Sequence, residues 1–387
     1  MRYLLLGAGK MGRAVVYDLC KHSPDAQLIV VDSHAARLEA ITEEFPHERI
    51  SVIKADVGDL DEMSYILSSA DIVISCVSHK FNYNLAKAAI EAGTHFCDLG
   101  GNEDTVRKQF LLDEMARDKG VAVIPDCGLA PGMVSILAAA AVAELDDTHE
   151  IKIYVGALPV DPRPPLNHTQ TSSVDGLIDE YAEDATIIRD GKLLRIPSLS
   201  EIEEIDFPAP FGKMECFHTA AGISTLPVSF GSRVRTLEFR TIRYPGHADK
   251  MKLLKDLGFM DSTAMPVSNP PVTARALLAQ VLEKRLPKDE PDVVLLRVAA
   301  KGIKGKKETQ LKWECVDYSD EEKNLSATMR STAFPISIIA QMLSTNYIKD
   351  RGTLYQEQSI PIELFLKEIS KRGIEIKKTE KTAASKS

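Results

Sequence analysis

The sequence predicts a two-domain α/β protein: a doubly wound parallel sheet, followed by a second α+β domain with a mostly antiparallel sheet. Short apolar runs alternate with amphipathic segments up to about residue 144. Longer strands of alternating polarity follow, and helix-like apolar spacing returns after residue 330. With 387 residues, of which 44% are hydrophobic and 27% charged, the chain is long enough for two ordinary globular domains.

The first domain is expected over residues 1–130 as about six strand–helix units. Its Val- and Ile-rich runs are typical of strands that are buried on both faces of a parallel sheet. The amphipathic segments between these runs have the length of helices that cover such a sheet. The predicted strands are residues 3–6, 27–31, 50–55, 71–77, 94–100 and 121–125, and the predicted helices are residues 11–22, 34–45, 60–69, 82–93 and 105–120.

The second domain is expected over residues 131–330. Period-two alternation predicts strands within it at residues 150–159, 213–220, 234–246, 292–300 and 308–318. Residues 331–377 are expected to form helices, at 334–348 and 360–373, that pack back on the first domain. The tail, residues 378–387, is polar and lacks aromatic residues, so it is expected to be disordered.

Charge and cysteine content limit the classes of partner. A net charge of -9 argues against nucleic acid or an anionic membrane as the main partner and favours a small molecule. The six cysteines form no CxxC pair, so neither a metal site nor a disulfide framework is expected, and a reducing cytoplasm fits. The N-terminal apolar run breaks at glycines, so no signal peptide is expected. Residues 133–143, the longest nearly apolar stretch, are too short to span a bilayer.

A glycine-rich loop follows the first predicted strand and opens the first predicted helix. Its GxGxxG spacing in this context predicts a Rossmann-type dinucleotide site, with the diphosphate at the helix N-terminus. Asp32 ends the second strand, where a carboxylate accepts hydrogen bonds from ribose hydroxyls and repels a 2′-phosphate, so NAD is favoured. Arg37 keeps NADP as an alternative. The predicted cofactor-binding residues are Gly7, Ala8, Gly9, Lys10, Met11, Gly12, Asp32, Ser33, Asp56, Val57, Cys76, Val77, Ser78 and Leu99.

Two polar residues at strand ends are candidates for catalysis. His79 follows the fourth strand, either as a proton carrier beside the nicotinamide or as a polar residue at the start of a loop. Asp126 follows the sixth strand, either as a catalytic group or as a residue that satisfies the turn before a helix. Residues 98–101, Asp-Leu-Gly-Gly, end the fifth strand at the same carboxyl edge, which favours a functional role for Asp126.

Six motifs along nearly the whole chain carry a family resemblance. They are GAGKMGRA at 7–14, AIEAGTHFCDLGG at 89–101, DCGLAPGM at 126–133, YVGALP at 154–159, GISTLP at 222–227 and TIRYPGH at 241–247. On these motifs the chain resembles the saccharopine dehydrogenase-like family, and within it the L-lysine 6-dehydrogenase type. The resemblance implies NAD-dependent oxidative deamination of the lysine ε-amine to 2-aminoadipate 6-semialdehyde, which would cyclise, with release of ammonia. It also implies a homodimer or a larger homo-oligomer.

The implied reaction sets chemical demands that single out further residues. The ε-amine has a pKa of about 10.4 in water, so a base must take its proton, and Asp126 and His79 are the candidates. The α-carboxylate calls for a bidentate arginine, for which we predict Arg243. Arg235, Arg240 and Arg297 are the alternatives to Arg243. The other predicted substrate-binding residues are Gly128, Ser172, Ser173, Thr225 and His247.

Other functions stay open at this point. Saccharopine dehydrogenase or reductase chemistry shares the fold and the hydride step, but its substrate has three carboxylates and needs further cationic partners. A dehydrogenase that forms carboxylated polyamines is a third possibility. Outside the enzymes, a regulator that senses NAD would bind the cofactor without turnover.

Overall fold

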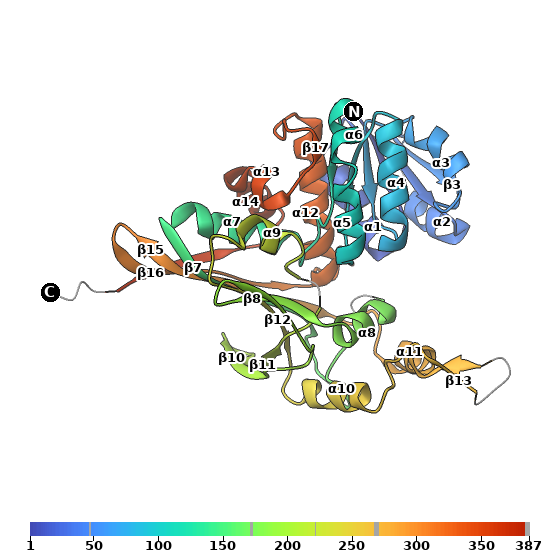
Figure 1. Cartoon of the computed structure of the whole chain (residues 1–387). Helices are drawn as coiled ribbons and strands as arrows, with labels where there is room; N and C mark the ends of the chain where they lie inside the picture. Colours follow the sequence, from blue (N-terminus) through green and yellow to red (C-terminus); the bar gives the residue numbers. More distant parts are fainter. Residues whose placement is uncertain (46–47, 171–172, 221, 267–270, 384–387) are drawn as a thin grey trace. The chain divides into compact units, whose positions relative to one another are not determined.

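The computed structural model describes residues 1–45, 48–170, 173–220, 222–266 and 271–383. The chain divides into two compact units, each described here by itself. Unit 1 comprises Met1–Ala140 and Met329–Ile374, and unit 2 comprises Ala141–Thr328 and Glu375–Ser387. Figure 1 shows the order of the elements along the chain.

Unit 1 is built on a seven-stranded sheet in which every neighbouring pair is parallel, which confirms the predicted doubly wound sheet. The strand order is β17-β6-β5-β4-β1-β2-β3, so the winding direction reverses between β1 and β4. In such sheets, ligands bind at the carboxyl ends of the strands beside this switch point. The strands are β1 (Arg2–Leu6), β2 (Gln27–Asp32), β3 (Ile50–Lys54), β4 (Ile72–Ser75), β5 (His95–Asp98), β6 (Ala122–Ile124) and β17 (Gly352–Thr353).

Figure 1 shows the helices of unit 1, of which α1 to α5 lie beside this sheet. They are α1 (Lys10–His22), α2 (Ala35–Glu44), α3 (Leu60–Leu67), α4 (His79–Glu91), α5 (Glu103–Phe110), α6 (Asp113–Asp118), α7 (Met133–Glu144), α12 (Ala327–Ser344), α13 (Gln356–Ser359) and α14 (Ile362–Lys371). Leucines and isoleucines of α3 and α4 pack with Leu4 and Phe96 of the sheet in one buried core. Asp18 of α1 accepts hydrogen bonds from Ser337 of α12 (2.6 Å) and from Arg372 at the end of α14 (2.7 Å).

Unit 2 is built on a nine-stranded mixed sheet with the main order β10-β11-β12-β7-β15-β16-β18. The predicted antiparallel character holds for most pairs, but β12 runs parallel to β7. A parallel neighbour needs a long crossover, and the connection from β7 to β12 contains α8, four strands and α9. The strands are β7 (Asp147–Pro159), β8 (Ala185–Arg189), β9 (Lys192–Ile196), β10 (Glu203–Phe207), β11 (Gly212–Phe217), β12 (Thr236–Arg243), β15 (Asp292–Lys304), β16 (Lys307–Tyr318) and β18 (Lys377–Thr382).

The helices of unit 2 are α8 (Val174–Ala182), α9 (Leu226–Phe230), α10 (His247–Asp256) and α11 (Ala274–Arg285), with a small hairpin of β13 (Ala264–Met265) and β14 (Val272–Thr273). Side chains of α8, α10 and α11 form a shared core around Tyr181 and Met251, both fully buried. This core holds α8 and α10 together, which places Tyr181 and His247 in contact. No helix of the described chain has both the length and the apolar character needed to cross a membrane.

The prediction of a disordered tail from residue 378 is wrong for residues 378–382. These residues belong to β18, which pairs antiparallel with β16 from Thr309 to Glu314. Lys378 stacks over the ring of Trp313 at 5.6 Å and also pairs with Glu144. Because the stabilising partners are backbone groups and an aromatic ring far back in the chain, the polar composition of the tail did not reveal the strand.

Candidate functional site

A cavity of about 310 Å³ opens at the carboxyl ends of β1, β2 and β4 in unit 1. Most of the predicted cofactor-binding residues line it: Gly7, Gly9, Asp32, Ser33, Asp56, Val57, Cys76, Val77 and Ser78. Arg37 and Phe81 also line it. The cavity therefore lies beside the switch point of the sheet, where the topology predicts a ligand.

The three glycines of the loop have different structural roles. A Cβ atom on Gly12 would lie 1.8 Å from the carbonyl oxygen of Gly7, so only glycine lets α1 pack this closely against β1. Gly7 has a φ of 96°, which also favours glycine. A Cβ on Gly9 would meet no atom within 4 Å and would point into open space beside the cavity. Gly9 precedes α1 without a side-chain cap, so the helix N-terminus suits a phosphate.

Asp32 is held in the cavity wall by backbone donors. Its two carboxylate oxygens accept hydrogen bonds from the N–H groups of Ala8 and His34, each at 2.8 Å, and Arg37 lies 3.5 Å away. Burial alone would raise the pKa of Asp32, but these N–H groups, together with the charge of Arg37 and the ring of His34, outweigh burial and lower the pKa. Asp32 is therefore a carboxylate at neutral pH, with lone pairs left for ribose hydroxyls.

Some predicted cofactor residues lie outside this cavity. Ala8, Lys10, Met11, Gly12 and Leu99 do not line it; Ala8 and Gly12 support it from behind through the contacts just described. The sequence analysis missed Phe81, in the first turn of α4 and 36% exposed. An exposed aromatic residue just after a strand end at the carboxyl edge was the available signal, because such a ring can stack on a base.

The ends of β5 and β6 meet around a buried carboxylate, Asp98. Its Oδ1 accepts hydrogen bonds from the N–H groups of Gly100 (2.6 Å) and Asp126 (3.4 Å), and its Oδ2 accepts one from Gln109 (2.7 Å). Burial raises the pKa of Asp98 to about 6, although these donors oppose the shift. Gln356 donates from its amide to the carbonyl oxygens of Pro125 (2.7 Å) and Asp126, which ties the second strand end to α13.

Asp126 is placed by this framework in a tightly packed position. Its φ is 63°, a left-handed conformation that non-glycine residues adopt at a cost and that concentrates at functional sites. It is only 2% exposed, and a Cβ on Gly100 would lie 1.6 Å from its Oδ1. Little of the Asp126 side chain is accessible to a substrate in this packing. Its catalytic role therefore stays a prediction. The glycine pair after β5 also lies close to His79, since a Cβ on Gly101 would be 3.8 Å from Nδ1 of His79.

His79 is the first residue of α4 and is partly exposed. The loop-residue interpretation is thus wrong in its local structure, because the helix begins there, after Ser78 at the N-cap position. The glycine pair 100–101 brings the two catalytic candidates to one edge of the sheet. Of these candidates, His79 is the more accessible to a ligand.

We expect Asp98→Asn to change how stability depends on pH. The carboxyl has a pKa of about 6 when folded and about 3.9 when unfolded, so its charged form destabilises the fold. This cost is absent below about pH 4 and complete above about pH 6. The stability of Asp98→Asn relative to the natural protein should therefore rise by on the order of 3 kcal/mol from pH 4 to pH 7.5, measured by urea unfolding.

The amide of Gln109 can reverse to accommodate this change, since its Oε1 is buried without a hydrogen-bond partner among the described residues. Asp104→Asn is the matched control, because Asp104 is 73% exposed. If the difference in unfolding free energy between Asp98→Asn and the natural protein is the same at all pH values, the raised pKa of Asp98 is contradicted.

In unit 2, Arg243 lies in a buried polar cluster at the end of β12. Its Nε donates to the hydroxyl of Tyr181 (3.1 Å) and its Nη1 to the carbonyl oxygen of Ile242 (3.0 Å). The nearest carboxylate, Glu180, is 3.8 Å from Nη2. Tyr181 in turn contacts His247, so two predicted substrate-binding residues come together in one cluster.

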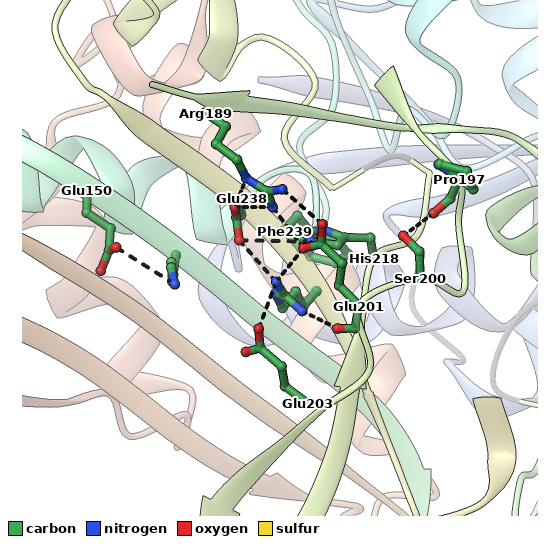
Figure 2. A network of polar contacts seen from close by, with 11 residues as sticks. Glu150, Arg189, Pro197, Ser200, Glu201, Glu203, His218, Glu238 and Phe239 are labelled. Atoms are coloured by element: carbon green, nitrogen blue, oxygen red, sulfur yellow. Dashed lines mark hydrogen bonds and ion pairs between the residues drawn. The ribbon is translucent and has the colours of Figure 1, made fainter. Parts of the chain in front are cut away.

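Two of the three alternative arginines, Arg240 and Arg297, are neutralised by carboxylates. Figure 2 shows the network around Glu201 and Glu238. Arg240 belongs to it and lies 3.2–3.3 Å from the carboxylates of Glu201, Glu203 and Glu238. Arg297 pairs with Glu314 at 2.5 Å and stacks on Phe207, while Arg235 is exposed. Among the residues that the structure describes, the buried arginines are Arg240, Arg243 and Arg372, and only Arg243 lacks a carboxylate within 3.5 Å.

Three of the remaining predicted substrate-binding residues, Ser173, Thr225 and Gly128, have local structural roles. Ser173 caps α8, accepting a hydrogen bond from the N–H of Gly176, and the buried Thr225 occupies the N-cap position of α9. Gly128 is buried in unit 1, where its carbonyl oxygen would lie 2.0 Å from a Cβ on Gly132. Ser172 lies outside the described residues. Within the described ranges, no group of three or more His, Cys, Asp or Glu side chains could hold a metal ion.

The chain is similar to known saccharopine dehydrogenases and alpha-aminoadipic semialdehyde synthases. The chain is 25% identical over 290 residues to saccharopine dehydrogenase [NADP(+), L-glutamate-forming] of Saccharomyces cerevisiae, a match that covers 72% of this chain and 63% of the yeast enzyme. It is 22% identical over 295 residues to mitochondrial alpha-aminoadipic semialdehyde synthase of Mus musculus, covering 73% of this chain and 31% of that protein. The chain thus matches less than two thirds of the length of these relatives.

The solved structure of the apo saccharopine dehydrogenase (L-Glu forming) from Saccharomyces cerevisiae has a similar fold. The TM-score is 0.80 at 21% identity, and the match covers 99% of this chain and 100% of the yeast chain. The model of the saccharopine dehydrogenase NADP binding domain matches residues 3–124, and the model of the saccharopine dehydrogenase C-terminal domain matches residues 128–374. Because these models cover both structural units, the chain belongs to the saccharopine dehydrogenase family.

Proposed function

We propose that this protein is an NAD-dependent dehydrogenase that oxidatively deaminates the ε-amine of L-lysine to 2-aminoadipate 6-semialdehyde and ammonia. The observation that carries the proposal is the state of Arg243, a buried arginine whose nearest carboxylate, that of Glu180, lies 3.8 Å away. One such cation suits a substrate with a single carboxylate. Saccharopine has three, and the other buried arginines of the described chain, Arg240 and Arg372, are already neutralised.

The residues of unit 1 fit a nicotinamide dinucleotide. The open space at Gly9 and the uncapped N-terminus of α1 suit the diphosphate, and Asp32 suits the ribose hydroxyls. When bound, the cofactor accepts the hydride. We propose NAD because the charged Asp32 would repel a 2′-phosphate. The yeast saccharopine dehydrogenase named above is an NADP(+) enzyme, and Ser33 and Arg37 at the cavity favour NADP as the second candidate.

The chain's own groups would act on the substrate in two ways. Arg243 would bind the α-carboxylate through its terminal nitrogens, because Nε and one bond of Nη1 are already used within the protein. His79 or Asp126 would take the proton from the ε-ammonium, since hydride leaves the ε-carbon only when the nitrogen lone pair is free. The same group could then activate the water that hydrolyses the imine. The homo-oligomeric state stays a prediction.

The test is formation of NADH or NADPH at mildly alkaline pH, with lysine or saccharopine as substrate and NAD or NADP, respectively, as cofactor. We expect turnover with lysine and NAD, faster at alkaline than at neutral pH because the free amine is needed. Replacing the base should lower kcat strongly while NAD still binds, so His79→Gln and Asp126→Asn identify which residue acts.

Each other outcome of this assay assigns a different function. Turnover only with saccharopine would assign the saccharopine reaction and overturn the proposal. NAD binding without turnover of either substrate would favour a carboxylated polyamine as product or a cofactor-sensing regulator. Preference for NADP would indicate that Arg37 and Ser33 bind the 2′-phosphate of the cofactor, in place of hydrogen bonds that Asp32 accepts from the ribose hydroxyls.

A further inference from the structure

A buried chain of hydrogen bonds in unit 2 ends on Arg243. It joins the end of β12, α8 and the first residue of α10. Arg243 Nε lies 3.1 Å from the hydroxyl oxygen of Tyr181, this oxygen lies 2.9 Å from Nε2 of His247, and Nδ1 of His247 lies 2.8 Å from the carbonyl oxygen of Leu166. Tyr181 and His247 are fully buried, and Arg243 is 5% exposed.

The chemistry of the two ends sets the direction of every bond in this chain. The carbonyl oxygen of Leu166 can only accept, so Nδ1 of His247 carries a hydrogen. Nε2 of the neutral ring is then an acceptor, and the Tyr181 hydroxyl donates to it. The Tyr181 oxygen is left to accept from Nε of Arg243, which can only donate. The side chains of Arg243, Tyr181 and His247 therefore form a chain of hydrogen bonds, here called the relay, in which no donor and acceptor can exchange roles.

Both central groups are neutral in the protein. Burial, with the charge of Arg243 beside it, lowers the pKa of His247 to about 3. Burial raises the pKa of Tyr181 to about 12, although Arg243 opposes the shift. Neither group titrates between pH 5 and pH 10, so the relay keeps its direction across the range in which enzymes are assayed.

The framework around the relay leaves its groups little freedom. Glu215 of β11 accepts hydrogen bonds from the N–H groups of Gly246 (2.7 Å) and Ala248 (2.6 Å), which fixes the backbone on both sides of His247. The ring of Tyr181 is packed in the core that α8 shares with α10. The Tyr181 hydroxyl oxygen is thus held in one position. Because it accepts the hydrogen bond from Nε of Arg243, it sets the plane of the guanidinium.

We propose that Tyr181 is a positioning residue for substrate binding: its hydroxyl orients Arg243 so that the terminal nitrogens present one edge to the substrate α-carboxylate. The inference rests on the proposed function. It also changes the role predicted for His247, which acts through Tyr181 as the acceptor that turns the hydroxyl toward Arg243. A planar bidentate contact depends on orientation, so a guanidinium without its Nε partner binds a carboxylate less well.

The test compares Tyr181→Phe with Tyr244→Phe. Tyr244 is the matched control, because its hydroxyl makes one hydrogen bond, to the carbonyl oxygen of Pro159 at 2.9 Å. Tyr244 accepts a hydrogen bond from the N–H of His247 through its backbone carbonyl oxygen, which Tyr244→Phe leaves in place. We expect Tyr181→Phe to raise KM for lysine roughly 10- to 100-fold, the range for loss of a hydrogen bond to a charged group. We expect kcat to change less than threefold, NAD affinity to be unchanged, and Tyr244→Phe to leave KM within twofold of the natural protein.

A second pair of variants tests the direction of the relay. The oxygen of glutamine in His247→Gln can stand where Nε2 stands and accept from Tyr181, whereas the shorter side chain in His247→Asn reaches only the position of Nδ1. His247→Gln should therefore keep KM closer to the natural value than His247→Asn. Equal KM values for these two variants, or a normal KM for Tyr181→Phe, would overturn the inference.

Failure of the proposed function is distinguishable from failure of the relay. Absence of lysine turnover in the natural protein counts against the proposed function alone. The variants are also titrated calorimetrically with lysine in the presence of NADH, and with saccharopine in parallel; NADH cannot accept a hydride, so the relay is tested without turnover. Weaker binding in Tyr181→Phe and His247→Asn supports the relay, and unchanged binding of both substrates contradicts it.

Discussion

Replacing Gly12 with alanine is expected to abolish binding of the dinucleotide and to destabilise unit 1. The added Cβ would lie 1.8 Å from the carbonyl oxygen of Gly7 and 2.9 Å from its carbonyl carbon, so α1 must move away from β1. Overpacking of this kind costs about 1–3 kcal/mol. It also displaces the helix N-terminus from the cavity, so we expect at least a 100-fold loss of NAD affinity, measured by fluorescence titration, together with a lower Tm.

Gly9→Ala is the matched variant that separates binding from stability. Gly9 has a φ of -73°, which alanine adopts freely, and a Cβ there would meet no atom of the protein within 4 Å. Its methyl group would occupy space that a diphosphate needs, so NAD affinity should fall roughly 10-fold or more at unchanged Tm. Normal NAD affinity in both variants would show that the cofactor does not bind at this loop.

Removing Arg372 should cause the largest loss of stability among the ion pairs. Arg372 binds both carboxylate oxygens of Asp18, at 2.7 and 3.0 Å, and the side chains of both residues are at most 1% exposed. Arg372→Ala leaves the buried carboxylate of Asp18 with hydrogen bonds from Ser337 and Gln341 and with the ring of His22 3.7 Å away. Breaking a buried pair on one side costs about 3–5 kcal/mol, so the Tm should fall by on the order of 10 °C.

Arg107→Ala is the control for this prediction. Arg107 and Asp104 are both 73% exposed, and such surface pairs contribute about 0–1 kcal/mol. The double variant Asp18→Leu with Arg372→Met should recover most of the stability, because no charge is left buried. If Arg372→Ala is no less stable than Arg107→Ala, then Asp18 is not held as a charged group by Arg372.

The cofactor cavity could be predicted because its signals are local. The GxGxxG spacing, the strand before it and Asp32 after the second strand lie within a short stretch of chain, and the carboxyl ends of parallel strands must meet at one edge. The positions after β3 and β4 followed from the same rule, and Asp56, Val57 and Ser78 line the cavity. Phe81 was missed because helical position, rather than a motif, brings its ring to the wall.

The polar clusters could not be predicted because their partners are distant in sequence. Gln356 contacts the backbone of Asp126 from 230 residues away, and no pattern near either residue indicates this pairing. The choice among the arginines depended on distances that only the fold sets: three carboxylates lie 3.2–3.3 Å from Arg240, whereas the nearest carboxylate to Arg243 is 3.8 Å away. Tyr181 sits in an ordinary amphipathic segment, so its hydroxyl gained a role only through contact with two other elements.

By itself, the sequence determined the parallel sheet, the mostly antiparallel character of the second sheet and the dinucleotide loop, because hydrophobic periodicity and glycine spacing express the backbone's local requirements. The tertiary structure decided the parallel pairing of β12 with β7, the strand β18 in the polar tail, the burial of Asp126 and the loose pairing of Arg243. The physical reason is the same in each case. Burial and charge neutralisation depend on which distant groups the fold brings within a few ångströms, and no local pattern records that distance.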